Sequence, residues 1–158
     1  MTEVSIASTG AEPSVIRMGD DAVLTVKFQS PMAIRPCCGF TIKTDRGGRI
    51  FHVSDRFSSQ LANSRPTDSG TVTCFLRNLP LMPGRYLIDL WLEDFSSRKP
   101  FDMVTDACWF EVYPADLLGS GMLPPLTEGP VFFKGQWSLW PNHDGKVPVF
   151  EGEKFTNG

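Results

Sequence analysis

The sequence predicts an all-β domain, an immunoglobulin-like sandwich of antiparallel strands. Three observations support this fold class. Apolar residues recur at every second position in several short segments, which is the period of a half-buried strand. Fourteen glycines and thirteen prolines among 158 residues favour many turns. No segment has an amphipathic helical pattern longer than two turns. About seven short strands separated by turn signals are typical of such a sandwich.

The strands follow in order along the chain. Val4 and Ile6 predict an opening edge strand. Alternation then predicts strands at residues 22–29, 40–44, 50–53, 71–76, 86–93 and 107–113. Breakers lie between these runs, at residues 18–21, 30–31, 35–36, 65–70, 80–84, 96–100 and 113–114. Asp45-Arg46-Gly47-Gly48 predicts a hairpin turn.

Tyr86 opens a strand directly after the turn residues Pro83-Gly84. This placement is typical of a tyrosine corner, where the hydroxyl donates to a nearby backbone carbonyl, so we predict a structural role. Neither residues 22–29 nor residues 86–93 contain cysteine, which excludes the disulfide of extracellular immunoglobulin domains.

The four cysteines are Cys37, Cys38, Cys74 and Cys108, and no two are spaced as a zinc site requires. Adjacent Cys37 and Cys38 point to opposite faces of a strand. We therefore predict reduced, partly buried thiols and neither a metal nor another cofactor.

Composition and charge exclude several classes of protein. The net charge of −3 argues against nucleic-acid binding, which needs a basic face. No apolar run is long enough to cross a membrane. The first ten residues lack the basic and apolar regions of a signal peptide.

The organisation changes near residue 117. We expect a sandwich over residues 1–116 and a flexible tail over residues 141–158. Between them, residues 117–140 combine a Gly- and Pro-rich linker with one more strand at residues 130–137. That strand can return to its own sheet or be exchanged with a second subunit.

The order of these motifs resembles a known family. The shared features are the leading strand, the strand ending at Phe28, and Gly39-Phe40-Thr41-Ile42 followed by its hairpin. Leu81-Met82-Pro83-Gly84-Arg85-Tyr86, residues 106–112, Gly119-Ser120-Gly121 and the late strand complete the series. Residues 2–140 thereby resemble the C-terminal carbohydrate-binding domain of Wzt-type ATP-binding subunits of O-antigen polysaccharide ABC transporters.

The resemblance implies a non-catalytic module that recognises the capped non-reducing end of lipid-linked O-antigen polysaccharide before export. It implies a homodimer that exchanges its last strand, with a transporter membrane subunit and an upstream nucleotide-binding domain as partners. It also implies a location on the cytoplasmic side of the bacterial inner membrane. The chain has no phosphate-binding loop of the Gly-x-x-x-x-Gly-Lys type, so we expect no ATPase activity from these residues.

Sugars are bound by aromatic rings together with charged and amide hydrogen-bonding groups. We place such a site on the face of the predicted sheet that points away from the core, where strands 40–44, 86–93 and 107–113 are neighbours. Its candidate residues are Trp91, Trp109, Asp89, Glu93, Lys43, Thr41 and His52. Arg49, Arg56 and Lys43 are candidates for meeting an anionic cap.

Two alternatives stay open. The face with Trp91 and Trp109 can instead be covered by the exchanged strand or by residues 54–70, in a structural or dimerisation domain without ligand. Asp89 and Glu93 can instead serve as the paired carboxylates of a glycan-modifying enzyme.

Overall fold

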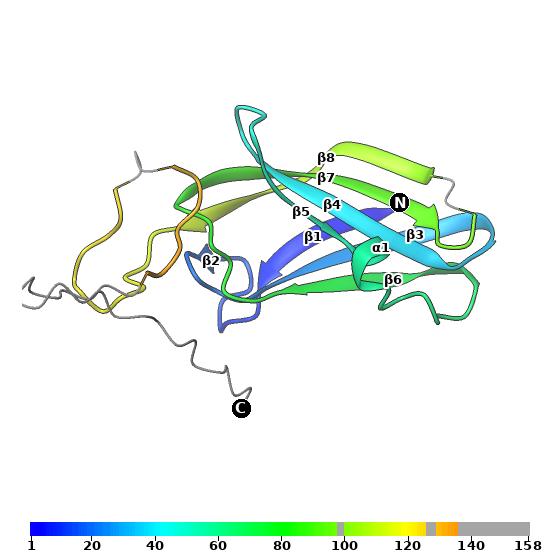
Figure 1. Ribbon diagram of the computed structural model, residues 1–158, viewed down its shortest axis with the longest axis horizontal. Helices are drawn as coiled ribbons and strands as arrows, with labels where there is room; N and C mark the ends of the chain where they lie inside the picture. Colours follow the sequence, from blue (N-terminus) through cyan, green and yellow to red (C-terminus); the bar gives the residue numbers. More distant parts are fainter. Residues whose placement is uncertain (98–99, 126–128, 136–158) are drawn as a thin grey trace, which may run out of the picture.

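The computed structural model describes residues 1–97, 100–125 and 129–135. Within these ranges the chain forms two stacked sheets (Figure 1). The elements are β1 (Glu3–Ser8), β2 (Ile16–Arg17), β3 (Ala22–Ile34), β4 (Pro36–Thr44), β5 (Arg49–Ser54), α1 (Asp55–Ser58), β6 (Thr67–Leu76), β7 (Gly84–Asp94) and β8 (Pro100–Tyr113). The predicted two-sheet β fold is confirmed.

The smaller sheet has the strand order β1-β3-β6, and the larger has the order β2-β8-β7-β4-β5. The predicted edge strand is β1, and the three strands predicted to be neighbours are β4, β7 and β8. The pairing is antiparallel except at β2, which runs parallel to the end of β8. The prediction of purely antiparallel strands is wrong there, because two residues are too few to show any alternation.

β7 shows how the alternating pattern places the core. Tyr86, Ile88, Leu90 and Leu92 are each at most 3% exposed and pack in the hydrophobic cluster between the sheets. Each such burial contributes about 1.5–3 kcal/mol. The alternate residues of β7 therefore face away from the smaller sheet.

Two strands extend beyond their predicted bounds. Ser30-Pro31 was expected to break the chain, but β3 continues to Ile34. Pro31 lies where the register with β6 shifts, between Gln29 and Ile34, so no ladder hydrogen bond is required from its nitrogen. β8 begins at Pro100, before the predicted strand at residues 107–113, and is irregular opposite β7.

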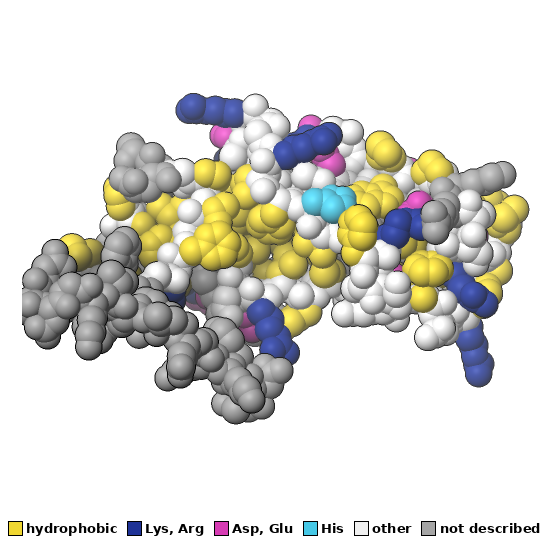
Figure 2. Space-filling model, in the orientation of Figure 1, with side chains coloured by type: hydrophobic (Ala, Val, Ile, Leu, Met, Phe, Trp, Pro, Cys, Tyr) yellow, Lys and Arg dark blue, Asp and Glu magenta, His cyan; other side chains and the backbone are white. Residues whose placement is uncertain are grey.

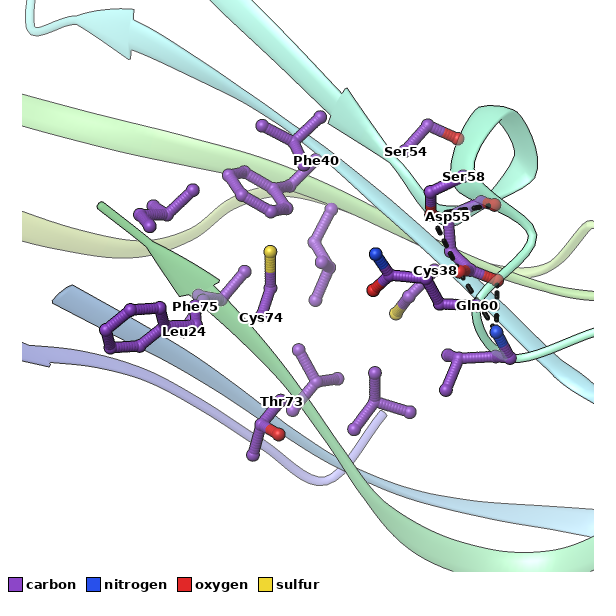
Figure 3. A pocket seen from close by; sticks show the side chains of 16 residues that line it. Leu24, Cys38, Phe40, Ser54, Asp55, Ser58, Gln60, Thr73, Cys74 and Phe75 are labelled. Atoms are coloured by element: carbon purple, nitrogen blue, oxygen red, sulfur yellow. Dashed lines mark hydrogen bonds between the residues drawn. The ribbon is translucent and has the colours of Figure 1, made fainter. Parts of the chain in front are cut away.

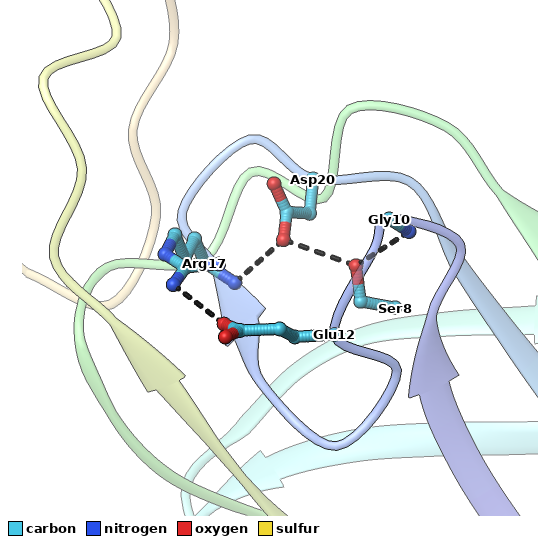
Figure 4. A network of polar contacts seen from close by, with 5 residues as sticks. All are labelled: Ser8, Gly10, Glu12, Arg17 and Asp20. Carbon is cyan, nitrogen blue, oxygen red and sulfur yellow. Dashed lines mark hydrogen bonds and ion pairs between the residues drawn. The ribbon is translucent and has the colours of Figure 1, made fainter.

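A polar network fixes the connection from β1 to β3 (Figure 4). One carboxylate oxygen of Asp20 accepts hydrogen bonds from the Arg17 amide at 2.8 Å and the Ser8 hydroxyl at 3.1 Å. Ser8 is 6% exposed, and its oxygen also accepts from the Gly10 amide at 3.1 Å. Arg17 pairs with Glu12 at 3.0 Å. The buried hydroxyl is thus satisfied, as the cost of an unpaired polar group requires.

The predicted tyrosine corner is present. The Tyr86 hydroxyl donates to the Met82 carbonyl at 2.6 Å and is buried. Burial raises the pKa of Tyr86 to about 12. This contact anchors the turn before β7 to the strand itself.

The segment after the linker returns to its own chain. Met82 donates to the Pro130 carbonyl at 3.0 Å, and Phe132 donates to the Pro80 carbonyl at 2.8 Å. Leu81 and Val131 form one isolated bridge. Up to residue 135, the predicted strand at residues 130–137 therefore consists of a single bridge. Its end and the predicted tail at residues 141–158 lie outside the described residues.

Candidate functional site

The outer face of the larger sheet, which we define as the side turned away from the smaller sheet, holds the candidate residues. Register sets their neighbours: Thr41 lies opposite His52 on β5 and opposite Asp89 on β7. Gly39 and Met103 flank Trp91 on β4 and β8. Tertiary pairing thus brings three distant parts of the sequence together on this face.

Trp91 and His52 form the aromatic centre of the face. Their rings are parallel within 5°, with centroids 4.6 Å apart. The Thr41 hydroxyl lies 3.1 Å from Nδ1 of His52 and forms a hydrogen bond that orients the imidazole. On β4, a Cβ at position 39 would lie 1.9 Å from Cζ2 of Trp91, so glycine leaves the space that the indole fills.

Charged groups lie next to this aromatic pair. The Lys43 ammonium contacts carboxylate oxygens of Asp89 and Asp106, each at 2.7 Å. Hydrogen bonds to Asp106 and Asp89 raise the pKa of Lys43. Burial acts to raise the pKa of Asp89, but the Lys43 ammonium and the Asp106 amide, 3.0 Å away, outweigh it and lower that pKa. Lys43 and Asp89 are therefore both charged at neutral pH, and the contacts of the ammonium hold the hydrogen-bonding groups of the cluster in fixed positions.

Glu93 lies two residues beyond Trp91 on the same face of β7, but its carboxylate is paired with a cation of α1. It is 8% exposed and forms an ion pair with Arg56 of α1, in which Nε of Arg56 donates to Oε1 at 2.7 Å. Cys37 lies opposite Glu93 in register. Burial first, and then the negative charge of Glu93, raise the pKa of this thiol to about 11. The carboxylate of Glu93 is thus paired with the guanidinium of Arg56.

Trp109 stands apart from Trp91. It lies opposite Leu87 on β7, and the Arg85 guanidinium carbon is 5.0 Å from its ring centroid. Leu87 and Trp91 are four residues apart, which is roughly 13 Å along a strand. The predicted face therefore contains two separate aromatic positions.

The sequence did not indicate three of the contributing residues: Gly39, Arg85 and Asp106. Gly39 carried a usable signal, because glycine inside a strand pattern often marks a close approach. Asp106 has φ of 53°, in the irregular part of β8 that precedes the predicted strand at residues 107–113. Arg56 was expected to meet an anionic cap, and its pairing with Glu93 was not expected. Arg85 gave no local signal, because its contact with Trp109 is set by folding.

Asp89 and Glu93 do not have the spacing that the paired carboxylates of a glycosidase require. Asp89 and Glu93 are four residues apart on β7, roughly 13 Å along the strand. Paired catalytic carboxyl groups lie about 5–9.5 Å apart. Each carboxylate here is also held by a different cation, Lys43 or Arg56.

Both the sequence and the fold of this chain are similar to known proteins. A model of the Wzt C-terminal domain matches residues 1–123. The chain belongs to the Wzt C-terminal domain family. This is a non-catalytic accessory domain associated with the ATPase of O-antigen ABC transporters.

A solved structure described as "Crystal structure of the C-terminal domain of wzt" is similar to this Wzt C-terminal domain. The TM-score is 0.66 at 16% identity, covering 87% of this chain and 81% of that chain. At this identity the likeness shows the fold alone. Curated protein sequences contain no match to the chain.

The Wzt C-terminal domain also has a hollow between its sheets, of about 500 Å³, where β5 and β6 are not joined (Figure 3). Hydrophobic side chains show at the surface along this side of the molecule (Figure 2). Cys38 and Cys74 line the hollow from opposite sheets, and burial raises both pKa values, that of Cys38 to about 12. Neither thiol is an activated nucleophile, since a nucleophilic cysteine needs a lowered pKa.

Among residues 1–97, 100–125 and 129–135, no cluster of three His, Cys, Asp or Glu side chains could hold a metal ion. No helix in the same ranges is both long and apolar enough to span a membrane.

Proposed function

We propose that this domain binds the capped non-reducing end of lipid-linked O-antigen polysaccharide and so selects it for export. The observation that carries the proposal is the stacked pair of Trp91 and His52 beside the Lys43–Asp89–Asp106 cluster, on an outward sheet face. Aromatic faces pack on the apolar C–H face of a pyranose, and fixed charged groups make strong hydrogen bonds to its hydroxyls.

The geometry favours a rigid platform. Gly39 supports the indole from the neighbouring strand, and Thr41 holds the imidazole. A site whose groups are already in position spends little free energy on ordering side chains when a ligand binds. Strands also place side chains more reproducibly than loops do.

The ion pairs on this face indicate which cation is available for an anionic cap. Arg56 is paired with Glu93, and Lys43 with two carboxylates. Of the three cations considered for an anionic cap, Arg49 is the one that forms no ion pair with the part of the chain that the structure describes. It is exposed on β5, opposite Lys43. Arg49 is therefore our candidate contact for an anionic substituent.

The family context supports partners and a location that we propose with this function. The domain works next to the ATPase and the membrane subunit of the transporter, at the cytoplasmic side of the inner membrane. We propose a homodimer in which the segment after residue 130 is exchanged as an extra strand of an immunoglobulin-like sandwich, so that the hydrogen bonds it makes with Pro80 and Met82 of its own chain would be made with the partner subunit instead. Deletion of residues 130–140 would then dissociate the dimer.

The test is titration of the purified domain with O polysaccharide from its own strain, capped and uncapped, by calorimetry and NMR. We expect binding of the capped form, lost in Trp91→Ala without loss of the fold. Phe75→Ala is the matched control, because Phe75 is a 50% exposed aromatic residue on β6, in the smaller sheet.

The outcomes separate the candidate functions. Absence of any binding by the unaltered domain would support a purely structural or dimerisation role. Unfolding of Trp91→Ala would assign this residue to packing. Turnover of the polysaccharide, lost in Asp89→Asn with binding retained, would support the enzyme alternative.

A further inference from the structure

Besides the half-buried Trp91, the outer face carries an exposed aromatic position that a single terminal sugar does not need. Trp109 is 61% exposed, and it projects from β8, a strand whose other positions supply the core residues Phe110 and Val112. The Arg85 guanidinium lies over its ring at 5.0 Å. An exposed tryptophan on a sheet strand, stacked with arginine, has the composition of a recognition surface.

The two aromatic positions are separated along the sheet. Trp109 lies beside Leu87, and Trp91 lies four residues farther along β7, roughly 13 Å away. A ring stacked on one platform has its centroid within about 4.5–7 Å of it. One sugar ring therefore cannot contact both tryptophans, whereas a chain of several sugars can.

Polar groups occupy the interval between them. Asp89 lies midway between Leu87 and Trp91 on β7, and its carboxylate accepts from the Asp106 amide of β8. Lys43 bridges the two carboxylates, and the Asp106 side chain is 53% exposed. The strip defined by Trp109, the Lys43–Asp89–Asp106 cluster and Trp91 thus alternates an aromatic, a polar and an aromatic position.

This alternation distinguishes a glycan from a protein partner. The centres of protein interfaces are depleted of charged residues, because burying charges costs free energy. A polysaccharide offers hydroxyls that replace the water around such a cluster and apolar ring faces for the two tryptophans. The polar middle of the strip therefore matches a hydroxyl-rich chain.

We propose that Trp109, with Arg85, forms a second sugar subsite, so that the domain binds an internal stretch of polysaccharide as well as its end. This inference rests on the proposed function and extends it. Trp91 and His52 hold one sugar, the Lys43–Asp89–Asp106 cluster contacts the hydroxyls of the next, and Trp109 holds a later unit. Affinity then increases with chain length until the strip is filled.

The test compares ligands of graded length by calorimetry: monosaccharides, short fragments and intact O polysaccharide from the producing strain. We expect Trp109→Ala and Arg85→Met to weaken binding of the intact polysaccharide about three- to tenfold, the value of one aromatic contact. Binding of the monosaccharides should not change. Trp91→Ala should weaken every ligand.

The matched control is Phe75→Ala. Phe75 is also exposed, at 50%, and also lies under an arginine, Arg77 at 5.8 Å, but it belongs to the smaller sheet. Circular dichroism and sedimentation of each variant check its fold and oligomeric state.

Three results would overturn the subsite: equal affinity of Trp109→Ala and the unaltered domain for the polysaccharide, no dependence of affinity on chain length, or a change of oligomeric state on loss of Trp109. The first two leave the proposed function intact if Trp91 is still required. Failure of the unaltered domain to bind any of these ligands would overturn the proposed function itself.

Discussion

The indole of Trp91 on β7 occupies the space above Gly39 on β4. A Cβ at position 39 would lie 1.9 Å from Cζ2 and 2.1 Å from Cη2 of the ring. Gly39 is thus a structural condition for the orientation of Trp91, and through it for the stacking with His52.

Gly39→Ala should therefore displace the indole. Because the added methyl group overlaps rigid ring atoms, we expect a loss of about 1–3 kcal/mol in the free energy of unfolding. We also expect a shift of the Trp91 indole N–H resonance, assigned with Trp91→Phe. Gly70→Ala on β6 is the control, since its Cβ would lie 3.3 Å from the nearest atom, in Phe28. Equal effects of the two substitutions would contradict the close approach.

Lys43 and Asp89 should make stability depend on pH in opposite directions at the two ends of the scale. The pKa of Asp89 is lowered, so its contribution is present above the unfolded value of about 3.9 and is lost as pH falls through the folded pKa. The pKa of Lys43 is raised, so its contribution is present below about 10.4 and is lost as pH rises through the folded pKa.

Lys43→Met tests this coupling. Without the ammonium, the pKa of Asp89 rises, and the acid-induced loss of stability becomes smaller than in the unaltered protein. Urea denaturation at a series of pH values between about 3 and 7 measures it. Lys27→Met is the control, because Lys27 pairs with Glu3 at the surface, at 2.8 Å. Parallel pH profiles for all three proteins would show that Lys43 does not set the pKa of Asp89.

Tyr86→Phe should destabilise the domain by about 1–3 kcal/mol, because the substitution removes the donor to the buried Met82 carbonyl. Tyr113→Phe is the matched control: that hydroxyl donates to Glu111 at 3.3 Å at the surface. We expect a change within about 0.5 kcal/mol for this control. Denaturation midpoints for the two variants decide whether the tyrosine corner is a stabilising contact.

The four thiols should react slowly with a disulfide reagent in the folded protein. Cys37 and Cys38 are 0% and 9% exposed, and burial raises their pKa values to about 11 and about 12. We expect both to react only at the rate of unfolding, after Cys74 and Cys108, which are partly exposed. Rapid reaction of all four thiols without denaturant would contradict the buried placement. Mass spectrometry of the labelled peptides identifies the order.

The alternating pattern was a sufficient guide to β7 and to most of the other strands. Its information is local, since successive side chains point to opposite faces, and burial of one face selects the apolar set. The outward parity of Asp89, Trp91 and Trp109 followed from the same rule. The pattern failed at Pro31 and before Ala107, where register irregularities let strands continue without clean alternation.

Folding alone decided which outward residues meet. The pairing of the strands stacks His52 on Trp91 and brings the Asp106 carboxylate to the Lys43 ammonium. The fold also brings the Arg56 guanidinium to the Glu93 carboxylate. It also left Trp109 apart from Trp91, although the sequence grouped them. The residues of one strand and their parity are therefore determined by sequence, because a two-residue period is a local property. Contacts between strands depend on register, irregularities and side-chain reach, and these are settled only when the sheets assemble.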